Sequence, residues 1–254
     1  MSSKRETNAI PAVQPFVFHN GTAHFMHLVN PTRCAPMGKG VEVKTTLEDI
    51  VSESFPKVSA EEHNARMKAL KEKQDAEVKT KTIRRGVVVI HTGDGKGKST
   101  AGFGVAIRAA GHGQKVAVVQ FVKGTWKTGE QAALKRFPEI KHVVSGDGFT
   151  WNTQDREQDI ESAKHGWRIA QEMIQSDQYD VIVLDELNIA LRYHYLDADV
   201  IAQVLRDKPE KLSIIVTGRD APQVVIDVAD TVTNHEIVKH AYASGIRARK
   251  GVEY

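Results

Sequence analysis

The feature that most constrains the fold is a glycine-rich segment that directly follows a run of apolar residues. The run is Val87–His91, the segment is Thr92-Gly-Asp-Gly-Lys-Gly-Lys-Ser-Thr100, and residues 98–110 then have a helical pattern. A phosphate-binding loop has a glycine, four further residues and then Gly-Lys-Ser or Gly-Lys-Thr, between a strand and a helix. Gly97-Lys98-Ser99 matches the second half, whereas Thr92 stands at the position of the first glycine. The backbone N–H groups of such a loop and the start of its helix can still surround phosphate oxygens.

This loop predicts a binding site for a magnesium nucleotide. Lys98 supplies a positive charge for the phosphates, and the hydroxyl of Ser99 can coordinate Mg²⁺. A glycine-rich turn with chance lysines is the alternative, but it does not account for a strand, a loop and a helix in register. The expected ATP-binding residues are Gly93, Asp94, Gly95, Lys96, Gly97, Lys98, Ser99 and Thr100.

A second segment supports the nucleotide site. Val181-Ile-Val-Leu-Asp185-Glu186 reads as an apolar strand that ends in two carboxylates, which can hold Mg²⁺ directly or through water. The expected metal ligands are therefore Ser99, Asp185 and Glu186; the alternative for the two acids is helix capping or a surface position. Kinases, ATPases and many transferases share both motifs, so the motifs alone do not select a reaction.

From Gly86 onward, apolar runs alternate with amphipathic stretches. Near-continuous Val/Ile runs are typical of strands that are buried on both faces of a parallel sheet. We therefore expect an α/β fold of the P-loop NTPase-like (RecA-like) kind, a mostly parallel sheet with helices on both faces. The predicted strands are Val87–His91, Lys115–Phe121, Val181–Leu184 and Ser213–Thr217, with shorter ones near His142–Val144 and Thr231–Thr233. The predicted helices lie near Lys98–Ala110, Asp155–Ser176, Asp197–Arg206 and Pro222–Val228.

Composition excludes several classes of protein. The 35 Lys and Arg residues against 32 Asp and Glu residues, within 254 residues, give a net charge of +3, so a strongly basic nucleic-acid coat and wholesale disorder do not fit. The single cysteine, Cys34, cannot form an intramolecular disulfide and suits a reducing compartment. No apolar run approaches the roughly 20 residues of a membrane span, and the first nine residues lack the apolar core of a secretory signal. We expect a soluble, cytoplasmic protein without a membrane or nucleic-acid partner.

The chain is expected to have three parts. Residues 1–57 hold five of the eight prolines and predict a small appendage of unknown role. Residues 58–85 predict a charged helix over 58–82 and a linker, with Ser59 as N-cap and Glu62 as its capping-box partner. Residues 86–254 form the P-loop domain.

Residues 61–85 hold eight basic and five acidic residues, 8 − 5 = +3, which is the whole net charge. That helix is either a solvated helix or a clamp over a partner surface or an anionic ligand; nucleic-acid binding is disfavoured because acids interrupt the basic run.

A glycine-flanked aromatic segment lies between the two nucleotide motifs. It reads Ser145-Gly-Asp-Gly-Phe-Thr-Trp-Asn-Thr-Gln-Asp155, and it places Phe149 and Trp151 on a loop. Large rings on a loop either pack into the core or meet a flat, apolar ligand. The segment by itself leaves both possibilities open.

From about residue 72 to residue 254, the sequence resembles the ATP:corrinoid (cob(I)alamin) adenosyltransferases of the phosphate-loop type. In that family too, the first glycine of the loop is shifted. Ser99 stands where the family often has Thr, Asp94 stands where Asn is common, and residues 1–57 have no counterpart in short members. The ordered blocks that carry the resemblance are the phosphate loop, Val118-Val-Gln-Phe-Val-Lys-Gly-Thr-Trp126, Gly129-Glu130, Gly148-Phe-Thr-Trp-Asn-Thr-Gln154, Arg156-Glu157, Leu184-Asp-Glu-Leu187, Val216-Thr-Gly-Arg219, Ala229-Asp-Thr-Val232, Val238-Lys-His240 and Gly251-Val-Glu-Tyr254.

The resemblance implies that the Co(I) of a reduced corrinoid attacks the 5′ carbon of ATP and that triphosphate leaves. Co(I) is itself a strong nucleophile, so the protein needs to supply neither a nucleophile nor a general base, and it acts by positioning and by stabilising the leaving group. The implied catalytic residues are Lys98, Phe149 and Trp151. The two rings would press against the lower face of the corrin, displace the lower axial ligand and so ease reduction of Co(II).

The resemblance also implies partners. The charged helix matches a family helix that covers the active site, often across a homodimer, and an electron-donating reductase of the flavoprotein type is expected. Lys123 and Arg219 are further candidates for phosphate contacts, or else surface charges. Two other classes remain as alternatives: a phosphoryl-transfer kinase or ATPase, for which no base is evident beyond Glu186, and a non-catalytic corrinoid carrier or nucleotide-dependent binding partner.

Overall fold

The computed structural model describes residues 58–121, 128–145 and 155–253. The chain divides into two units, Met1–Asp75 and Ala76–Tyr254. The predicted appendage, residues 1–57, lies outside the described residues.

The charged segment forms one helix, α2 (Ala60–Lys79), slightly shorter than the predicted 58–82. Its first turn has the predicted capping box: the Glu62 N–H donates to Ser59 Oγ at 3.1 Å, and the Ser59 N–H donates to Glu62 Oε2 at 3.2 Å. None of its residues is buried, and Glu77 pairs with Lys81 one turn on, at 3.7 Å. Local interactions of this kind stabilise a helix only modestly.

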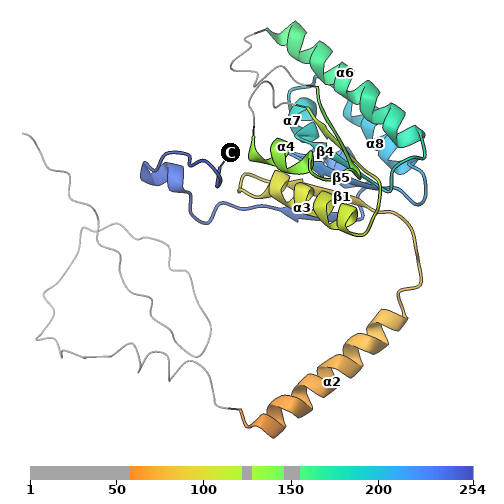
Figure 1. Ribbon diagram of the computed structural model, residues 1–254, viewed down its shortest axis with the longest axis vertical. Helices are drawn as coiled ribbons and strands as arrows, with labels where there is room; N and C mark the ends of the chain where they lie inside the picture. Colours follow the sequence, from red (N-terminus) through yellow and green to blue (C-terminus); the bar gives the residue numbers. More distant parts are fainter. Residues whose placement is uncertain (1–57, 122–127, 146–154, 254) are drawn as a thin grey trace, which may run out of the picture. The chain divides into compact units, whose positions relative to one another are not determined.

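The second unit is built on a parallel sheet of six strands, as expected (Figure 1). Its strand order is β3-β2-β4-β5-β1-β6, so the strand before the phosphate loop, β1, and the strand of the paired carboxylates, β4, are separated by β5 alone. The strands are β1 (Val88–Thr92), β2 (Val116–Gln120), β3 (Ile140–Val144), β4 (Val181–Asp185), β5 (Ser213–Thr217) and β6 (Thr231–Asn234).

Helices cover both faces of this sheet because successive side chains of each strand point to opposite faces. One core lies between the sheet and α3 (Lys98–Gly111), with Val183 and Ile215 from the strands facing Phe103 of α3. The other core lies between the sheet and α6 (Arg156–Gln175), with Leu184 and Val216 from the same strands on the side of Trp167 of α6. Figure 1 shows α3 on one side of the sheet and α6 with α8 on the other.

The α/β prediction is therefore confirmed, and the differences concern short elements. The predicted helix near Pro222–Val228 is a single turn, α9 (Gln223–Ile226), whereas α8 (Ala198–Arg206) begins one residue after its predicted start. The sequence did not predict α4 (Gly129–Leu134), α7 (Leu187–Arg192) or the 3₁₀ turn η1 (Ala241–Ser244). Within the described ranges, no helix combines the length and apolar composition that crossing a membrane requires.

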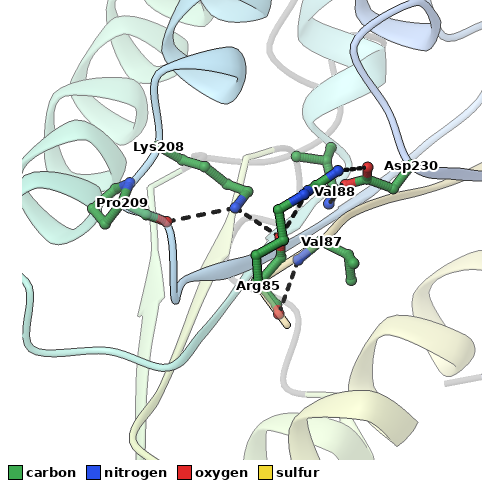
Figure 2. Close-up of polar contacts among 8 residues, drawn as sticks. Arg85, Val87, Val88, Lys208, Pro209 and Asp230 are labelled. Carbon is green, nitrogen blue, oxygen red and sulfur yellow. Dashed lines mark hydrogen bonds and ion pairs between the residues drawn. The ribbon is translucent and has the colours of Figure 1, made fainter. Parts of the chain in front are cut away.

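A polar network fastens the amino end of β1, at the opposite edge of the sheet from the phosphate loop (Figure 2). The Asp230 carboxylate accepts hydrogen bonds from Arg85 and, at 2.8 Å, from the Val88 N–H. Lys208 Nζ donates to the Gly86 carbonyl at 3.0 Å. Gly86 itself is buried, and a Cβ there would lie 2.0 Å from the carbonyl oxygen of Leu212, so this position requires glycine. Paired charges and close backbone packing thus fix the start of the first strand.

Candidate active site

The carboxyl ends of β1, β4 and β5 open on one cleft of about 490 Å³. Such an edge of a parallel sheet is the usual ligand site in α/β proteins. The cleft is lined by residues 94–100 of the phosphate loop and by Glu130, Glu186, Ile189, Arg192, Tyr193, Arg219, His240, Val252 and Glu253. The predicted ATP-binding residues from Asp94 to Thr100 therefore lie together at the cleft, and Gly93 lies at the base of the loop.

The glycines of the loop are required by close packing against the segment after β6. A Cβ on Gly93 would lie 2.2 Å from Asn234 Oδ1, and one on Gly95 would lie 2.6 Å from the carbonyl oxygen of Glu236. Gly97 has a φ of 107°, a backbone conformation that favours glycine. The N–H of Gly95 donates to the carbonyl of His235 at 2.6 Å, so in this structure that N–H supports the loop and does not face the cleft.

Lys98 begins α3 and is nearly buried, with 8% of its surface exposed. Its ammonium donates to the carbonyl of Gly95 at 2.5 Å, which holds it against the loop. Burial lowers the pKa of Lys98, the positive charge of Arg219 lowers it further, and the carboxylates of Glu186 and Asp94 act in the opposite direction. A poorly hydrated cation at the mouth of the loop is well suited to an anionic ligand, because its charge is weakly screened.

The two carboxylates after β4 have different environments. Asp185 is fully buried: its Oδ2 accepts from Gln120 Nε2 at 2.8 Å, and its Oδ1 accepts from Thr217 Oγ1 at 2.8 Å. Behind it, His142 Nε2 lies 2.8 Å from Gln120 Oε1. Glu186 instead lines the cleft. Of the two carboxylates, Glu186 therefore faces the cleft, whereas Asp185 is hydrogen-bonded to side chains of the neighbouring strands β2 and β5.

Glu186 has a left-handed backbone, with a φ of 62°, an uncommon conformation for a residue with a side chain. Its N–H donates to Thr217 Oγ1 at 3.0 Å, the same hydroxyl that donates to Asp185. The backbone therefore turns sharply between the buried carboxylate and the one at the cleft. Ser99 lines the same cleft, so a hydroxyl and a carboxylate, both oxygen donors that suit Mg²⁺, are available there.

Several other charged side chains of the cleft are ion-paired. Arg219, a candidate phosphate contact, lies 3.7 Å from Asp94, and both side chains are about half exposed or more. Lys96 pairs with Glu253 near the C-terminus. Neither Glu253 nor His240 was predicted as a site residue, although both lie in sequence blocks that carry the family resemblance. These blocks were the sequence signal that could have indicated a role for both residues.

Three cleft residues come from the unpredicted helix α7 and the position after it: Ile189, Arg192 and Tyr193. Tyr193 stacks on Tyr195 with ring centroids 5.7 Å apart, and Arg192 lies over Tyr193 at 5.6 Å. No motif in the sequence marks these side chains. Their proximity to the loop results from the strand order, which brings β4 near β1.

The predicted corrin-contacting rings, Phe149 and Trp151, lie outside the described residues, as does Lys123. Immediately after that segment, Asp155 caps α6: its Oδ1 accepts from the N–H groups of Glu157 and Gln158, each at 3.1 Å. The aromatic role therefore stays a prediction.

With the cleft described, comparison with known proteins is informative. The family model described as ATP:corrinoid adenosyltransferase BtuR/CobO/CobP matches residues 84–254. The chain belongs to the ATP:corrinoid adenosyltransferase family. The corrinoid adenosyltransferase of Pseudomonas aeruginosa is 46% identical over 193 residues, covering 76% of this chain and 95% of that protein. Those of a Sinorhizobium species and Escherichia coli K12 are 45% and 41% identical; they cover 75% and 78% of this chain, and 89% and 100% of their own lengths.

Membership of the adenosyltransferase family confirms the resemblance predicted from the ordered blocks. The matched region begins two residues before Gly86 and includes every residue that lines the cleft. The family's two substrates, ATP and a corrinoid, are thus the ligands to be considered for the cleft.

Proposed function

We propose that this protein transfers the 5′-deoxyadenosyl group of ATP to the Co(I) of a corrinoid, forming an adenosylcorrinoid and triphosphate. A Co–C5′ bond forms as the C5′–O bond breaks, and the electron pair of that bond leaves with the triphosphate. The observation that carries the proposal is a phosphate loop, with a nearly buried Lys98, on a cleft of a chain in this family. Such a site can assist the release of triphosphate, because the groups that stabilise negative charge are already in position.

In this proposal residues 93–100 bind the triphosphate. Lys98 counters the charge that increases on the leaving group, and Arg219 adds a second positive charge from the end of β5. The N–H of Gly97 and the N-terminus of α3 contribute partial positive charge. No side chain acts as nucleophile or base in this proposal, because Co(I) is the nucleophile and the reaction transfers no proton. The ammonium of Lys98 is engaged by the Gly95 carbonyl.

Mg²⁺ fits the same cleft through its donor set. Ser99 and Glu186 would hold the ion, and Asp185 would support the site from its buried position behind Glu186. When bound, Mg²⁺ would neutralise part of the phosphate charge, which is its usual role with nucleotides. Ser99 in place of the frequent Thr keeps the hydroxyl that this role needs.

The corrinoid side of the proposal depends on Phe149 and Trp151. If they displace the lower axial ligand, Trp151→Ala should impair the reaction that starts from Co(II) far more than the reaction that starts from pre-reduced Co(I). Equal losses in both assays would contradict the aromatic role. Lys123, which lies outside the described residues, is a further proposed phosphate contact.

We propose the remaining arrangement on the basis of the family resemblance. Residues 86–254 form the catalytic domain, residues 58–85 form a clamp helix and linker that cover the site of a homodimer partner, and residues 1–57 are an appendage. A flavoprotein-type reductase in the cytoplasm would supply the electron for Co(II). A chain that begins at Ser59, assayed beside the full chain, would show whether the appendage contributes to turnover.

The test of the function is an adenosylation assay with cob(I)alamin, ATP and Mg²⁺. The expected products are adenosylcobalamin, detected by its absorbance spectrum, and triphosphate, separated by ion-exchange chromatography. Release of ADP and phosphate at a comparable rate would favour phosphoryl transfer. Tight corrinoid binding without any product would favour a carrier.

A further inference from the structure

The segment that follows β6 supports the phosphate loop from below. His235 makes two backbone hydrogen bonds with it: its N–H donates to the Thr92 carbonyl at 2.8 Å, and its carbonyl accepts from the Gly95 N–H at 2.6 Å. The His235 ring lies beneath Gly97, because a Cβ built on Gly97 would be 3.5 Å from His235 Nδ1. The side chain of His235 is therefore in contact with the loop at Gly97.

The direction of the hydrogen bonds through this ring follows from its partners. His235 Nδ1 lies 3.2 Å from the Lys96 carbonyl, and His235 Nε2 lies 3.2 Å from His91 Nδ1. A carbonyl oxygen only accepts, so Nδ1 of His235 must donate. In a neutral ring Nε2 then accepts, and His91 Nδ1 must donate to it. The chain of donors runs from His91 on β1, through His235, to the Lys96 carbonyl.

This contact sets the orientation of one peptide in the loop. In a trans peptide the C=O and the following N–H point in opposite directions. Because the Lys96 carbonyl is directed at His235, the N–H of Gly97 is directed away from it, and Gly97 lines the cleft. Glycine rotates easily, so without a partner for that carbonyl the peptide can turn and remove its N–H from the cleft.

We propose that His235, held in its tautomer by His91, is a positioning residue that presents the Gly97 N–H to the triphosphate of ATP. This inference rests on the function proposed above. His235 does not touch the nucleotide; it acts through the Lys96–Gly97 peptide. Its effect should therefore fall on ATP and spare the corrinoid.

The variants follow from the two contacts of the ring. His235→Leu removes both. His235→Asn places an amide N–H close to the position of Nδ1, and so keeps a donor for the Lys96 carbonyl while losing His91. His91→Phe leaves the His235 ring in place but removes the donor that fixes its tautomer. His165→Leu, at an exposed position of α6, is the matched control for replacing a histidine by leucine.

Two measurements are made on the full-length protein. Binding is followed by fluorescence titration with methylanthraniloyl-ATP and Mg²⁺, and turnover gives separate KM values for ATP and for cob(I)alamin. His235→Leu should raise both the dissociation constant of the ATP analogue and the KM for ATP about tenfold, the size expected for loss of one well-placed hydrogen bond. The KM for cob(I)alamin should stay within about twofold. His235→Asn should recover most of the loss, His91→Phe should give a smaller increase, and His165→Leu none.

Three results would overturn the proposal: unchanged binding of the ATP analogue by His235→Leu, an Asn variant no better than the Leu variant, or equal increases in the KM values of both substrates. The last would indicate a general loss of structure, which melting curves would also show. The binding experiment does not need turnover. A wild-type protein that binds the analogue but makes no adenosylcorrinoid would refute the proposed function and leave the role of His235 testable.

Discussion

The two ends of strand β1 are held in different ways. At the amino end, Arg85 and Lys208 meet Asp230 and backbone carbonyls, so each charge has a partner (Figure 2). At the carboxyl end, the loop is held by backbone hydrogen bonds to His235, and the ammonium of Lys98 donates to a backbone carbonyl and not to a carboxylate. The amino end of the strand therefore contributes to stability, and the carboxyl end keeps a positive charge available for an anionic ligand. Substitutions at the amino end should lower the free energy of unfolding, whereas substitutions at the carboxyl end should weaken nucleotide binding.

The largest expected effect is that of Lys98→Ala. Removal of the buried ammonium takes away the main countercharge of the leaving triphosphate, so kcat/KM for ATP should fall at least about a hundredfold. Lys208→Ala, a lysine at the other end of the strand, should keep kcat/KM within about twofold and lower the melting temperature. Steady-state kinetics and thermal melts of both variants check this, and normal activity of Lys98→Ala would mean that the triphosphate binds elsewhere.

Two glycine substitutions compare the ends directly. In Gly86→Ala the new Cβ meets the Leu212 carbonyl, which should cost about 2 kcal/mol or more of unfolding free energy, while the affinity for ATP of the folded protein is unchanged. In Gly95→Ala the Cβ meets the Glu236 carbonyl, which should displace the loop and weaken ATP binding about tenfold or more. Calorimetry and nucleotide titration on each variant distinguish the two cases, and similar profiles would contradict the comparison.

Asp230→Asn should have a moderate effect that depends on pH. The hydrogen bond from Arg85 is the main reason that the pKa of Asp230 is lowered, with the Val88 N–H acting in the same direction and burial opposing. A carboxyl whose folded pKa is depressed stabilises the protein above its unfolded pKa, near 4, and this contribution is lost as pH falls through the folded value. At neutral pH the Asn variant should melt a few degrees lower, about 2–4 °C.

The matching measurement is a series of thermal melts from pH 7 to pH 3. The difference between wild type and Asp230→Asn should narrow only below about pH 4, because the carboxyl of the unfolded chain takes up a proton there, whereas that of the folded protein does so at a lower pH. A difference that stays constant over this range would show that the charge of Asp230 is unimportant.

The smallest expected effect is that of a substitution on β3, at the edge of the sheet. His142→Phe leaves the side-chain oxygen Oε1 of Gln120 without its donor, which should loosen the amide group that donates to Asp185. If Asp185 supports the proposed Mg²⁺ site through Glu186, the Mg²⁺ concentration for half-maximal activity should rise about two- to threefold. Activity titrated with Mg²⁺ checks this; an unchanged Mg²⁺ requirement would separate Asp185 from the metal site.

The sequence predicted what depends on short segments. The phosphate loop, the strand Ser213–Thr217 and the Ser59 capping box were all recognisable because a few neighbouring residues determine them. The helix α7 was not predicted, because it has six residues and its N-cap, Glu186, makes no side-chain capping bond. The edge strand β6 is exposed throughout and left only a weak signal.

Contacts between segments that are distant in the sequence could not be predicted from local sequence patterns. The order of the strands depends on packing across the whole sheet, and it decides that Tyr193 and Arg219 share a cleft with the loop. His235 lies 144 residues from His91 in the sequence, and nothing in either neighbourhood indicates that the rings meet. The division between a buried Asp185 and a cleft-facing Glu186 likewise depends on Gln120 and Thr217 from neighbouring strands.

The hydrogen bonds between His235 and the loop also bear on how fast nucleotide can associate. Since backbone groups of Thr92, Gly95 and Lys96 are already hydrogen-bonded to the backbone or the ring of His235, the loop has its shape before any ligand arrives, and its conformational entropy has been lost during folding. Association of ATP with this part of the cleft then requires no prior ordering step. In stopped-flow experiments the observed rate should increase linearly with nucleotide concentration, in a single phase limited by encounter.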